Sequence, residues 1–220
     1  PLVSRGEELT LLLLGRSEGT FSDRDVEIVT AFTHQALNAL DNARLFAEVQ
    51  NLGTTDSLTR VHNRRYFFEQ AELEFSRSKR YERDLALLLL DADHFRDVNE
   101  YYGQDVGDRV MKLMAGICRQ SLRHFDIIGR YSGESFIVML PETPVNVAAD
   151  VADRLRKNIG ELSIETHRGE LRLTISVGVA VNNFGSNREG AVDDLSSLIN
   201  KADMALYEAK RSGRNRVVVS

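Results

Sequence analysis

The 220-residue sequence lacks a long apolar run, a second cysteine and an excess of positive charge. Its apolar runs at Leu11–Leu14 and Leu85–Leu90 are far too short to cross a bilayer, and its first residues show no signal-peptide pattern. We therefore expect a soluble, cytoplasmic protein that meets a membrane only through parts outside this chain. Because the chain opens at Pro1 without an initiator Met, we expect it to be cut from a longer protein.

The single cysteine and the charge balance exclude further classes of protein. Cys118 alone can form neither an internal disulfide framework nor a zinc site of several thiolates, and its apolar neighbours predict a buried, inert thiol. The 28 Lys and Arg residues are outnumbered by 33 Asp and Glu residues and do not form a run. Nucleic-acid binding depends on clustered positive charge, so we expect no nucleic-acid partner.

The first fifty residues predict a connector in place of a second full domain. Leu9–Leu14 is typical of a short buried strand, and Ser22 before two aspartates is typical of a helix start. Apolar residues then recur at steps of three and four from Val29 to about Val49, which predicts one stripe along a long helix. The stripe is too short to identify a coiled coil, so packing against a truncated sensor domain and a parallel dimer seam both stay open.

Beyond Gly53 the pattern changes to alternating strands and helices. This alternation predicts an α/β (α+β) domain in which helices flank a mixed sheet. A hairpin is expected around Ser132 and Gly133. The expected strands are 85–90, 127–128, 136–140, 171–181 and 216–219, and the expected helices begin near 95 and cover 109–119, 147–159 and 195–210.

Asp91 ends the apolar run of the first of these strands, and Asp93 follows on the same side. A carboxylate at the end of a buried strand needs a metal ion or hydrogen bonds, and Mg²⁺ prefers oxygen ligands. The pattern therefore predicts a divalent-metal site, with a cap for the following helix as the alternative from these residues alone.

Five segments resemble, in the same order, the motifs of the GGDEF-domain (diguanylate cyclase-like) family. They are Asp56–Arg65, Asp91–Asn99, Tyr102–Asp108, the turn Ser132–Phe136 and Ala202–Arg216. Five motifs spread over about residues 54 to 219 are far more specific than any one of them. The resemblance implies a nucleotidyl-cyclase-like fold, with a mixed five-stranded sheet preceded by a long N-terminal helix.

The resemblance also implies a division of the chain into three parts. Residues 1–20 resemble the end of a GAF sensor domain, residues 21–53 a signalling and dimerisation helix, and residues 54–220 a GGDEF domain. In that family two domains face one another, each with a bound GTP, and produce cyclic di-GMP and two diphosphates. The implied protein is thus a bacterial, cytoplasmic homodimer that associates through its N-terminal helix.

The resemblance implies a site for Mg²⁺, with Mn²⁺ as an alternative, and for GTP. Asn99 and Asp108 would read the guanine edge, while Lys210 and Arg214 would hold the β- and γ-phosphates, although a cationic helix C-terminus would explain those two equally well. The implied metal ligands are Asp91, the Ala92 carbonyl and Glu134. The implied GTP-binding residues are Phe95, Arg96, Asn99, Asp108, Gly133, Lys210 and Arg214.

The turn departs from the family signature Gly-Gly-Asp/Glu-Glu-Phe at two positions. Ser132 replaces the first Gly, where a side chain would either be unfavourable by about 1 kcal/mol at positive φ or obstruct the ribose, a change that we expect to be tolerated. Ser135 replaces the second carboxylate, and a serine of ordinary pKa cannot take a proton from the ribose hydroxyl. Because the Glu134 carboxylate is retained, we expect metal binding to be kept. Because the carboxylate at Ser135 is lost, we expect proton transfer to be impaired.

A second constellation precedes the turn by nine residues. Arg123 and Asp126 match the family's Arg-x-x-Asp inhibitory site for cyclic di-GMP, and Arg154 stands where the family often supplies a further arginine. Taken alone, this pattern is usually a surface ion pair. In its context it implies a cyclic di-GMP site, since Arg binds guanine or phosphate acceptors and Asp accepts from guanine N–H groups.

Three functions stay open. The damaged turn beside an intact Arg-x-x-Asp site favours a weak or silent cyclase that binds cyclic di-GMP as a receptor. The preserved GTP-contacting positions favour an active cyclase that converts two GTP despite the altered turn. The third function is a dimerising relay that needs no nucleotide.

Overall fold

The computed structural model describes residues 2–3, 9–10, 21–184 and 192–220, and it divides into two units, Pro1–Gly53 and Thr54–Ser220. The first unit holds a short antiparallel pair, β1 (Leu2–Val3) and β2 (Leu9–Thr10), and the 30-residue helix α1 (Asp23–Leu52). The remainder of the strand predicted at Leu9–Leu14 lies outside the described residues. None of the described helices is both long and apolar enough to span a bilayer.

Helix α1 begins where the sequence predicts. The Ser22 hydroxyl accepts from the backbone N–H of Asp25, and the Asp25 carboxylate accepts in return from the backbone N–H of Ser22, so both orphan donors are satisfied. Along the helix, large apolar side chains face solvent, among them Phe32 with 73% and Leu40 with 65% of its surface exposed. In the single chain, Phe32 and Leu40 of the predicted stripe are therefore open to solvent.

The second unit is built on a five-stranded sheet with the order β4-β5-β3-β8-β9. All neighbours in the sheet are antiparallel except β8 and β9, so the sheet is mixed, as predicted. The strands are β3 (Leu85–Ala92), β4 (Ile127–Arg130), β5 (Ser135–Pro141), β8 (Ile175–Asn182) and β9 (Val217–Val219).

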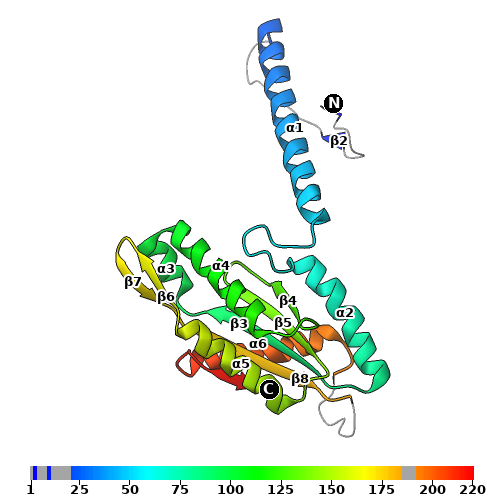
Figure 1. Ribbon diagram of the computed structural model, residues 1–220. Coiled ribbons are helices and arrows are strands. Elements are labelled where there is room, and N and C mark those ends of the chain that lie inside the picture. Colours follow the sequence, from blue (N-terminus) through cyan, green and yellow to red (C-terminus); the bar gives the residue numbers. More distant parts are fainter. Residues whose placement is uncertain (1, 4–8, 11–20, 185–191) are drawn as a thin grey trace. The chain divides into compact units, whose positions relative to one another are not determined.

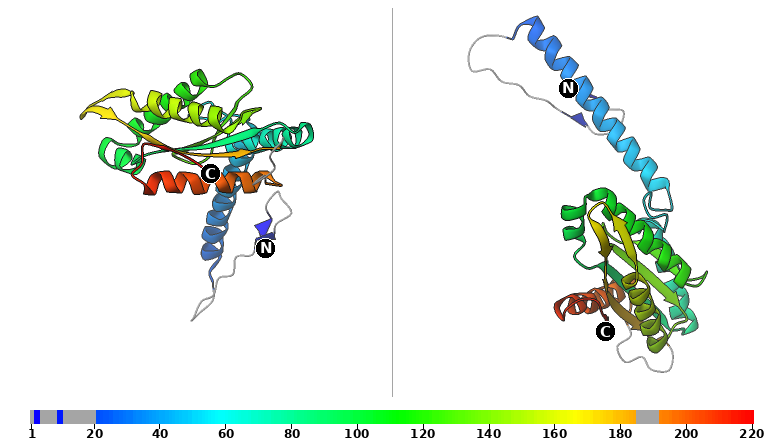
Figure 2. Two further views of the ribbon diagram at one scale, coloured as in Figure 1. Left: turned by 90° about the horizontal axis from the view of Figure 1, so that it is seen from below. Right: turned by 60° about the vertical axis from the view of Figure 1, so that its left-hand side comes forward.

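Helices cover both faces of this sheet (Figure 1), and α5 and α6 lie on opposite sides of it (Figure 2, left). Helices α3, α4 and α5 contribute to one apolar cluster, and α2 and α6 contribute to the other. Their bounds are α2 (Arg64–Tyr81), α3 (Phe95–Tyr102), α4 (Gln104–Ser121), α5 (Val145–Gly160) and α6 (Leu195–Arg211).

The central strand β3 explains the apolar run that the sequence shows at 85–90. All eight of its residues are buried. Leu85, Leu87 and Leu89 belong to one cluster, whereas Leu88 and Leu90 belong to the other. A strand covered on both faces needs apolar side chains on both sides, so it loses the usual alternation.

One predicted strand is divided in the structure. The sequence predicts a single strand over 171–181, but the chain changes sheets at Leu173 and Thr174. Before the break, β7 (Gly169–Arg172) pairs only with β6 (Ser163–Thr166) in a separate two-stranded sheet, and after the break β8 pairs with β3. We call Ser163–Arg172 the β6–β7 hairpin.

Candidate functional site

A charged cluster lies at the end of β3. The side chain of Asp91 is mostly buried, and one of its oxygens is 2.6 Å from the Lys210 ammonium in the last turn of α6. Burial raises the pKa of Asp91, and the ion pair with Lys210 acts in the opposite direction. Glu134, in the loop between β4 and β5, is close enough that burial and then the charge of Asp91 raise its pKa too. The structure thus brings three of the predicted site residues together.

The donors of this cluster fit a Mg²⁺ ion. Asp91 and Glu134 are like-charged carboxylates whose mutual repulsion a divalent cation would relieve, and the predicted third donor, the Ala92 carbonyl, follows Asp91 directly. In the described part of the chain, no group of three or more metal-binding side chains occurs. So sparse a set suits Mg²⁺, which keeps several waters and takes further ligands from phosphate.

Asp93 does not share this site, although the sequence pattern places it beside Asp91. It is 4% exposed, and protein donors occupy both of its oxygens. The hydroxyls of Thr174 and Ser176 each donate to it at 2.7 Å, and the backbone N–H of Asn215 donates at 3.0 Å. Asp93 is therefore a structural carboxylate. It connects the segment Ala202–Arg216, which carries Arg214, to the end of β3.

The two departures from the family signature meet in the turn. The Ser132 and Ser135 hydroxyls are 2.6 Å apart and form a hydrogen bond, and Ser135 is only 4% exposed. Neither Ser132 nor Gly133 lies in the left-handed region of φ. The penalty expected for a side chain at Ser132 was therefore wrong, because the backbone here needs no glycine.

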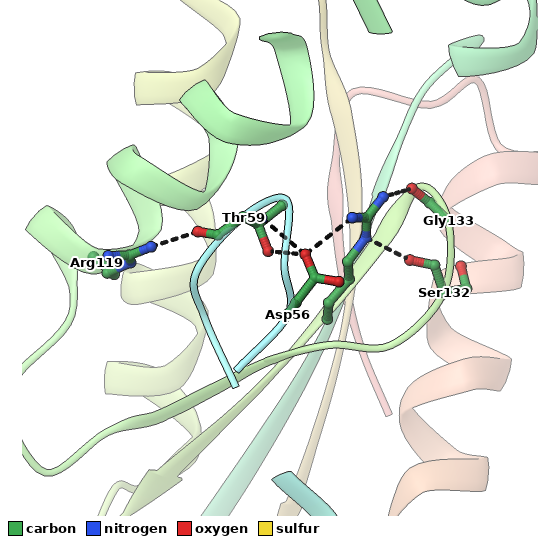
Figure 3. Close-up of polar contacts among 6 residues, drawn as sticks. Asp56, Thr59, Arg119, Ser132 and Gly133 are labelled. Carbon is green, nitrogen blue, oxygen red and sulfur yellow. Dashed lines mark hydrogen bonds and ion pairs between the residues drawn. The ribbon is translucent and has the colours of Figure 1, made fainter. Parts of the chain in front are cut away.

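Arg130, which the sequence analysis missed, bonds to this turn and to Asp56, and Figure 3 shows the turn residues Ser132 and Gly133 facing Asp56. The Arg130 guanidinium donates to the carbonyls of Ser132 at 3.2 Å and Gly133 at 2.8 Å, and to the Asp56 carboxylate at 3.0 Å. Asp56 also accepts from the backbone N–H and the hydroxyl of Thr59. The segment Asp56–Arg65, to which the sequence assigns no role, is thus connected to the turn through hydrogen bonds of Arg130. An arginine directly before a predicted turn was the only available signal.

The segment Asp56–Arg65 is also bonded to a helix of the domain and to β4. Arg119 on α4 donates to the carbonyl of Thr59, which is almost fully buried. The backbone N–H of His62 bonds to the carbonyl of Ile128, and the N–H of Arg130 bonds to the carbonyl of His62. Within the second unit, the segment that ends at His62 therefore runs along the edge of β4.

The predicted guanine-reading residues lie on the α3–α4 pair, and the first of them fills the space between these helices. Asn99 is on α3, and Asp108 is exposed on α4. A Cβ added to Gly107 would lie 1.9 Å from the Asn99 side-chain oxygen, so the Asn99 amide occupies the space that this glycine leaves free.

The predicted phosphate-binding groups surround the end of β3. Phe95 and Arg96 begin α3, where backbone N–H groups have no intrahelical acceptor. Lys210 is in the last turn of α6, and Arg214 follows in a left-handed conformation (φ 59) beside the segment that Asp93 anchors. These phosphate-binding roles stay predictions.

The Arg-x-x-Asp constellation lies at the opposite end of β4. Asp126 accepts from the backbone N–H of Arg123 at 2.7 Å, while its other carboxylate oxygen is buried and has no hydrogen-bond partner. Burial raises the pKa of Asp126, and the charges of Arg123 and Arg154 oppose that rise. Arg154 donates to the carbonyl of Ser121 at the end of α4. The structure brings the three predicted residues into one group.

Comparisons of sequence and of structure with known proteins identify the same family. Residues 53–216 match the family model "Diguanylate cyclase, GGDEF domain". Diguanylate cyclase A from Treponema denticola is 34% identical to this chain, in an alignment that covers 100% of this chain and 58% of the relative. Diguanylate cyclase DgcP from Pseudomonas aeruginosa is 38% identical, in an alignment that covers 76% of this chain and 24% of the relative. The chain thus spans less than two thirds of the length of each of these curated relatives.

Two solved structures have the same fold. The GGDEF domain of DgcB from Caulobacter crescentus, in complex with c-di-GMP, superposes with a TM-score of 0.68 at 28% identity, over 76% of this chain and 92% of that one. Diguanylate cyclase SiaD from Pseudomonas aeruginosa, in complex with its activator SiaC, superposes with a TM-score of 0.70 at 31% identity, over 90% and 78% of the two chains.

Proposed function

The chain belongs to the GGDEF-domain family of diguanylate cyclases, and from this membership we propose that it is a cyclic di-GMP signalling domain with a degenerate catalytic turn. It binds GTP with Mg²⁺ and converts two GTP into cyclic di-GMP and two diphosphates weakly or not at all. It binds cyclic di-GMP at the group formed by Arg123, Asp126 and Arg154.

The observation that carries the proposal is the hydrogen bond between the Ser132 and Ser135 hydroxyls. Ser135 stands directly opposite Asp91 in the antiparallel ladder, so the two side chains are on the same face of the sheet. A glutamate at this position would bring a second carboxylate beside Asp91. A buried serine hydroxyl bonded to another serine cannot act as that base, because its pKa is far above neutrality.

Retention of the charged cluster supports GTP binding without efficient turnover. Asp91, Glu134 and Lys210 keep the charges that triphosphate and Mg²⁺ require. When bound, Mg²⁺ would offset the negative charge of the phosphates. Lys210 and Arg214 would contact the phosphate oxygens, and the N–H groups at the start of α3 would do the same.

The free oxygen of Asp126 supports cyclic di-GMP binding. A buried carboxylate oxygen without a donor is unfavourable in the free protein, and a guanine N–H would satisfy it. The guanidinium of Arg123 is beside the Phe125 ring, 5.7 Å from its centroid, and stays exposed. It is available to guanine or phosphate acceptors of the same ligand.

The proposal extends to the first 53 residues and to the setting of the protein. Residues 1–20 are the end of a GAF-like sensor domain, and 21–53 are a signalling helix through which two copies associate in the bacterial cytoplasm. The exposed Phe32 and Leu40 on α1 support this association, because apolar side chains at helical spacing are buried when two such helices pair.

The decisive experiment is incubation of the chain with GTP and Mg²⁺, with every cyclic and linear product quantified, followed by calorimetry with cyclic di-GMP. We expect little or no cyclic di-GMP to form, and we expect the added dinucleotide to bind. Robust conversion of GTP to cyclic di-GMP by the unaltered chain would show that the catalytic turn is not degenerate.

An active cyclase is the second candidate, favoured by the retained Asp91–Lys210–Glu134 cluster. If the unaltered chain does turn over GTP, Asp91→Ala and Glu134→Ala should each abolish product formation. An unchanged rate in either variant would contradict the metal assignment. Binding of neither GTP nor cyclic di-GMP would leave a dimerising relay as the function.

A further inference from the structure

The β6–β7 hairpin (Ser163–Arg172) is outside the main sheet and has no role in the site described above. It is firmly held at its base, because Ile164 is 1% exposed and Leu171 is 6% exposed, and both belong to the core cluster on that face. Its tip, around Arg168 and Gly169, extends beside α3 (Figure 1).

The hairpin contacts the end of α3 through one arginine. The Arg168 guanidinium donates to the carbonyl of Tyr101 at 2.5 Å and lies 4.8 Å from the centroid of the Tyr101 ring. The Tyr101 carbonyl is among the last four of α3, which have no acceptor role inside the helix. A cation at a helix C-terminus also interacts favourably with the helix dipole. Arg168 therefore caps α3 from outside.

Helix α3 needs such support. It has only eight residues, its N-cap His94 is in the left-handed region (φ 56), and no side chain caps its N-terminus. Helices this short are marginal in isolation. The segment that carries Asn99 thus depends on tertiary contacts for its position.

The hairpin contacts α4 through a second arginine. Arg109, which follows Asp108 on α4, donates from its guanidinium to the carbonyl of Glu165 at 2.9 Å. The hairpin therefore bonds to both helices of the α3–α4 pair. The spacing of these helices matters, because the Asn99 amide occupies the narrow space against Gly107.

From these contacts we infer that the β6–β7 hairpin is a brace that sets the position of the guanine-binding α3–α4 pair, with Arg168 and Arg109 as positioning residues that do not touch the nucleotide. This inference rests on the proposed binding of GTP by Asn99 and Asp108. It assigns the hairpin a role in guanine affinity, remote from both the turn and the Arg123–Asp126 group.

The test compares Arg168→Ala with His167→Ala, which truncates the neighbouring exposed side chain at the same tip. Calorimetry uses a GTP analogue with a methylene α–β bridge plus Mg²⁺, and separately cyclic di-GMP. We expect Arg168→Ala to weaken the GTP analogue roughly tenfold, the loss that follows from one charged hydrogen bond. Cyclic di-GMP binding should change less than about twofold, since its group lies elsewhere.

Two further measurements separate positioning from general destabilisation. Arg168→Lys keeps a cationic donor for the Tyr101 carbonyl and should recover most of the lost affinity. Hydrogen exchange of the α3 amides should be faster in Arg168→Ala than in His167→Ala, with α5 unchanged as an internal reference. Equal affinities and equal α3 exchange in the two alanine variants would overturn the brace.

The exchange experiment also distinguishes the brace from the proposed function. If the unaltered chain does not bind the GTP analogue, GTP binding fails as a proposal, and the brace is then decided by α3 exchange alone. If the unaltered chain binds the analogue and Arg168→Ala binds it equally well, the role in guanine affinity is wrong while the proposed function stands.

Discussion

The two ends of strand β4 contrast in how their polar groups are satisfied. After β4, the turn is closed on itself, because the Ser132 and Ser135 hydroxyls bond to each other and Arg130 occupies two turn carbonyls. Before β4, Asp126 keeps a buried oxygen without a partner. A polar group that has its partner gains little from a ligand, whereas a buried orphan gains a full hydrogen bond. The contrast predicts that ligand recognition survives at one end of the strand while chemistry is lost at the other.

The largest effect is expected when the family residues are restored in the turn at positions 132 and 135, because this should return chemistry to that end of β4. We expect Ser135→Glu combined with Ser132→Gly to raise the rate of cyclic di-GMP formation by ~10²–10⁴-fold, because it returns a general base beside Asp91. Product formation from GTP and Mg²⁺ is the measurement. Ser132→Gly alone is the matched control and should give no comparable gain. A rate that stays at the level of the unaltered chain in the double variant would show that the turn is not what limits activity.

The second prediction concerns Arg123, before β4, and tests whether ligand binding survives at that end of the strand. Arg123→Ala is expected to weaken cyclic di-GMP binding by roughly 10–100-fold, the range for losing charge-assisted hydrogen bonds. Calorimetry would measure it, with His124→Ala as the neighbouring control. Equal affinity in both variants would mean that the dinucleotide binds elsewhere.

Substitution of Arg130 tests whether the turn is stabilised by its connection to Asp56. The exposed fraction of its side chain is 17%, and that of Asp56 is 21%. Arg130→Ala therefore removes the cationic partner of a partly buried carboxylate, which keeps only its bonds from Thr59, and removes the guanidinium donor from two turn carbonyls. We expect it to lower the free energy of unfolding by about 2–3 kcal/mol, measured by urea denaturation. The exposed pair of Arg172 and Glu170 provides the control, and Arg172→Ala should change stability by less than about 1 kcal/mol. An equal loss of unfolding free energy in both variants would show that Arg130 does not hold the turn and Asp56 together.

The smallest expected effect concerns the pH dependence of stability. Burial raises the pKa of Asp126 from its usual 3.8, so the folded state holds this proton more tightly than the unfolded state does. The corresponding stability is present below pH 3.8 and is lost as the pH rises through the folded-state pKa. We expect the unaltered chain to lose stability relative to Asp126→Asn as the pH rises above about 3.8. Parallel stability–pH curves for the two proteins would contradict this assignment.

Asp56 behaves in the opposite sense and offers a comparison within the same domain. Burial opposes its charge, but hydrogen bonds from Thr59 and then the Arg130 guanidinium outweigh burial and lower its pKa below 3.8. Its contribution to stability is therefore present above pH 3.8 and is lost as the pH falls through the folded-state pKa. The pKa shifts of Asp56 and Asp126 thus have opposite signs, because side-chain and backbone donors outweigh burial at Asp56, whereas one buried oxygen of Asp126 has no donor.

Much of the fold was predictable from local patterns. The apolar run of β3, the helices α5 and α6 and the strand β9 were found within a few residues, because burial imposes a periodicity that the sequence carries. Helix α2 was not predicted, although Asn63 caps it and Phe67, Ala71 and Phe75 recur at its buried face. The β6–β7 hairpin was also missed, because its residues are mostly polar and its partner is not the main sheet.

By itself the sequence determined the family, the class of fold and the positions of the motifs, since these depend on residue type, order and spacing. Only the tertiary structure decided which polar groups meet. It turned Asp93 toward Thr174, Ser176 and Asn215, which are 81 to 122 residues away along the chain. It also joined Ser132 to Ser135 and placed Arg130 between the turn and Asp56. A hydrogen bond needs a particular distance and direction, and strand register and helix packing set these across the whole domain, where no local pattern records them.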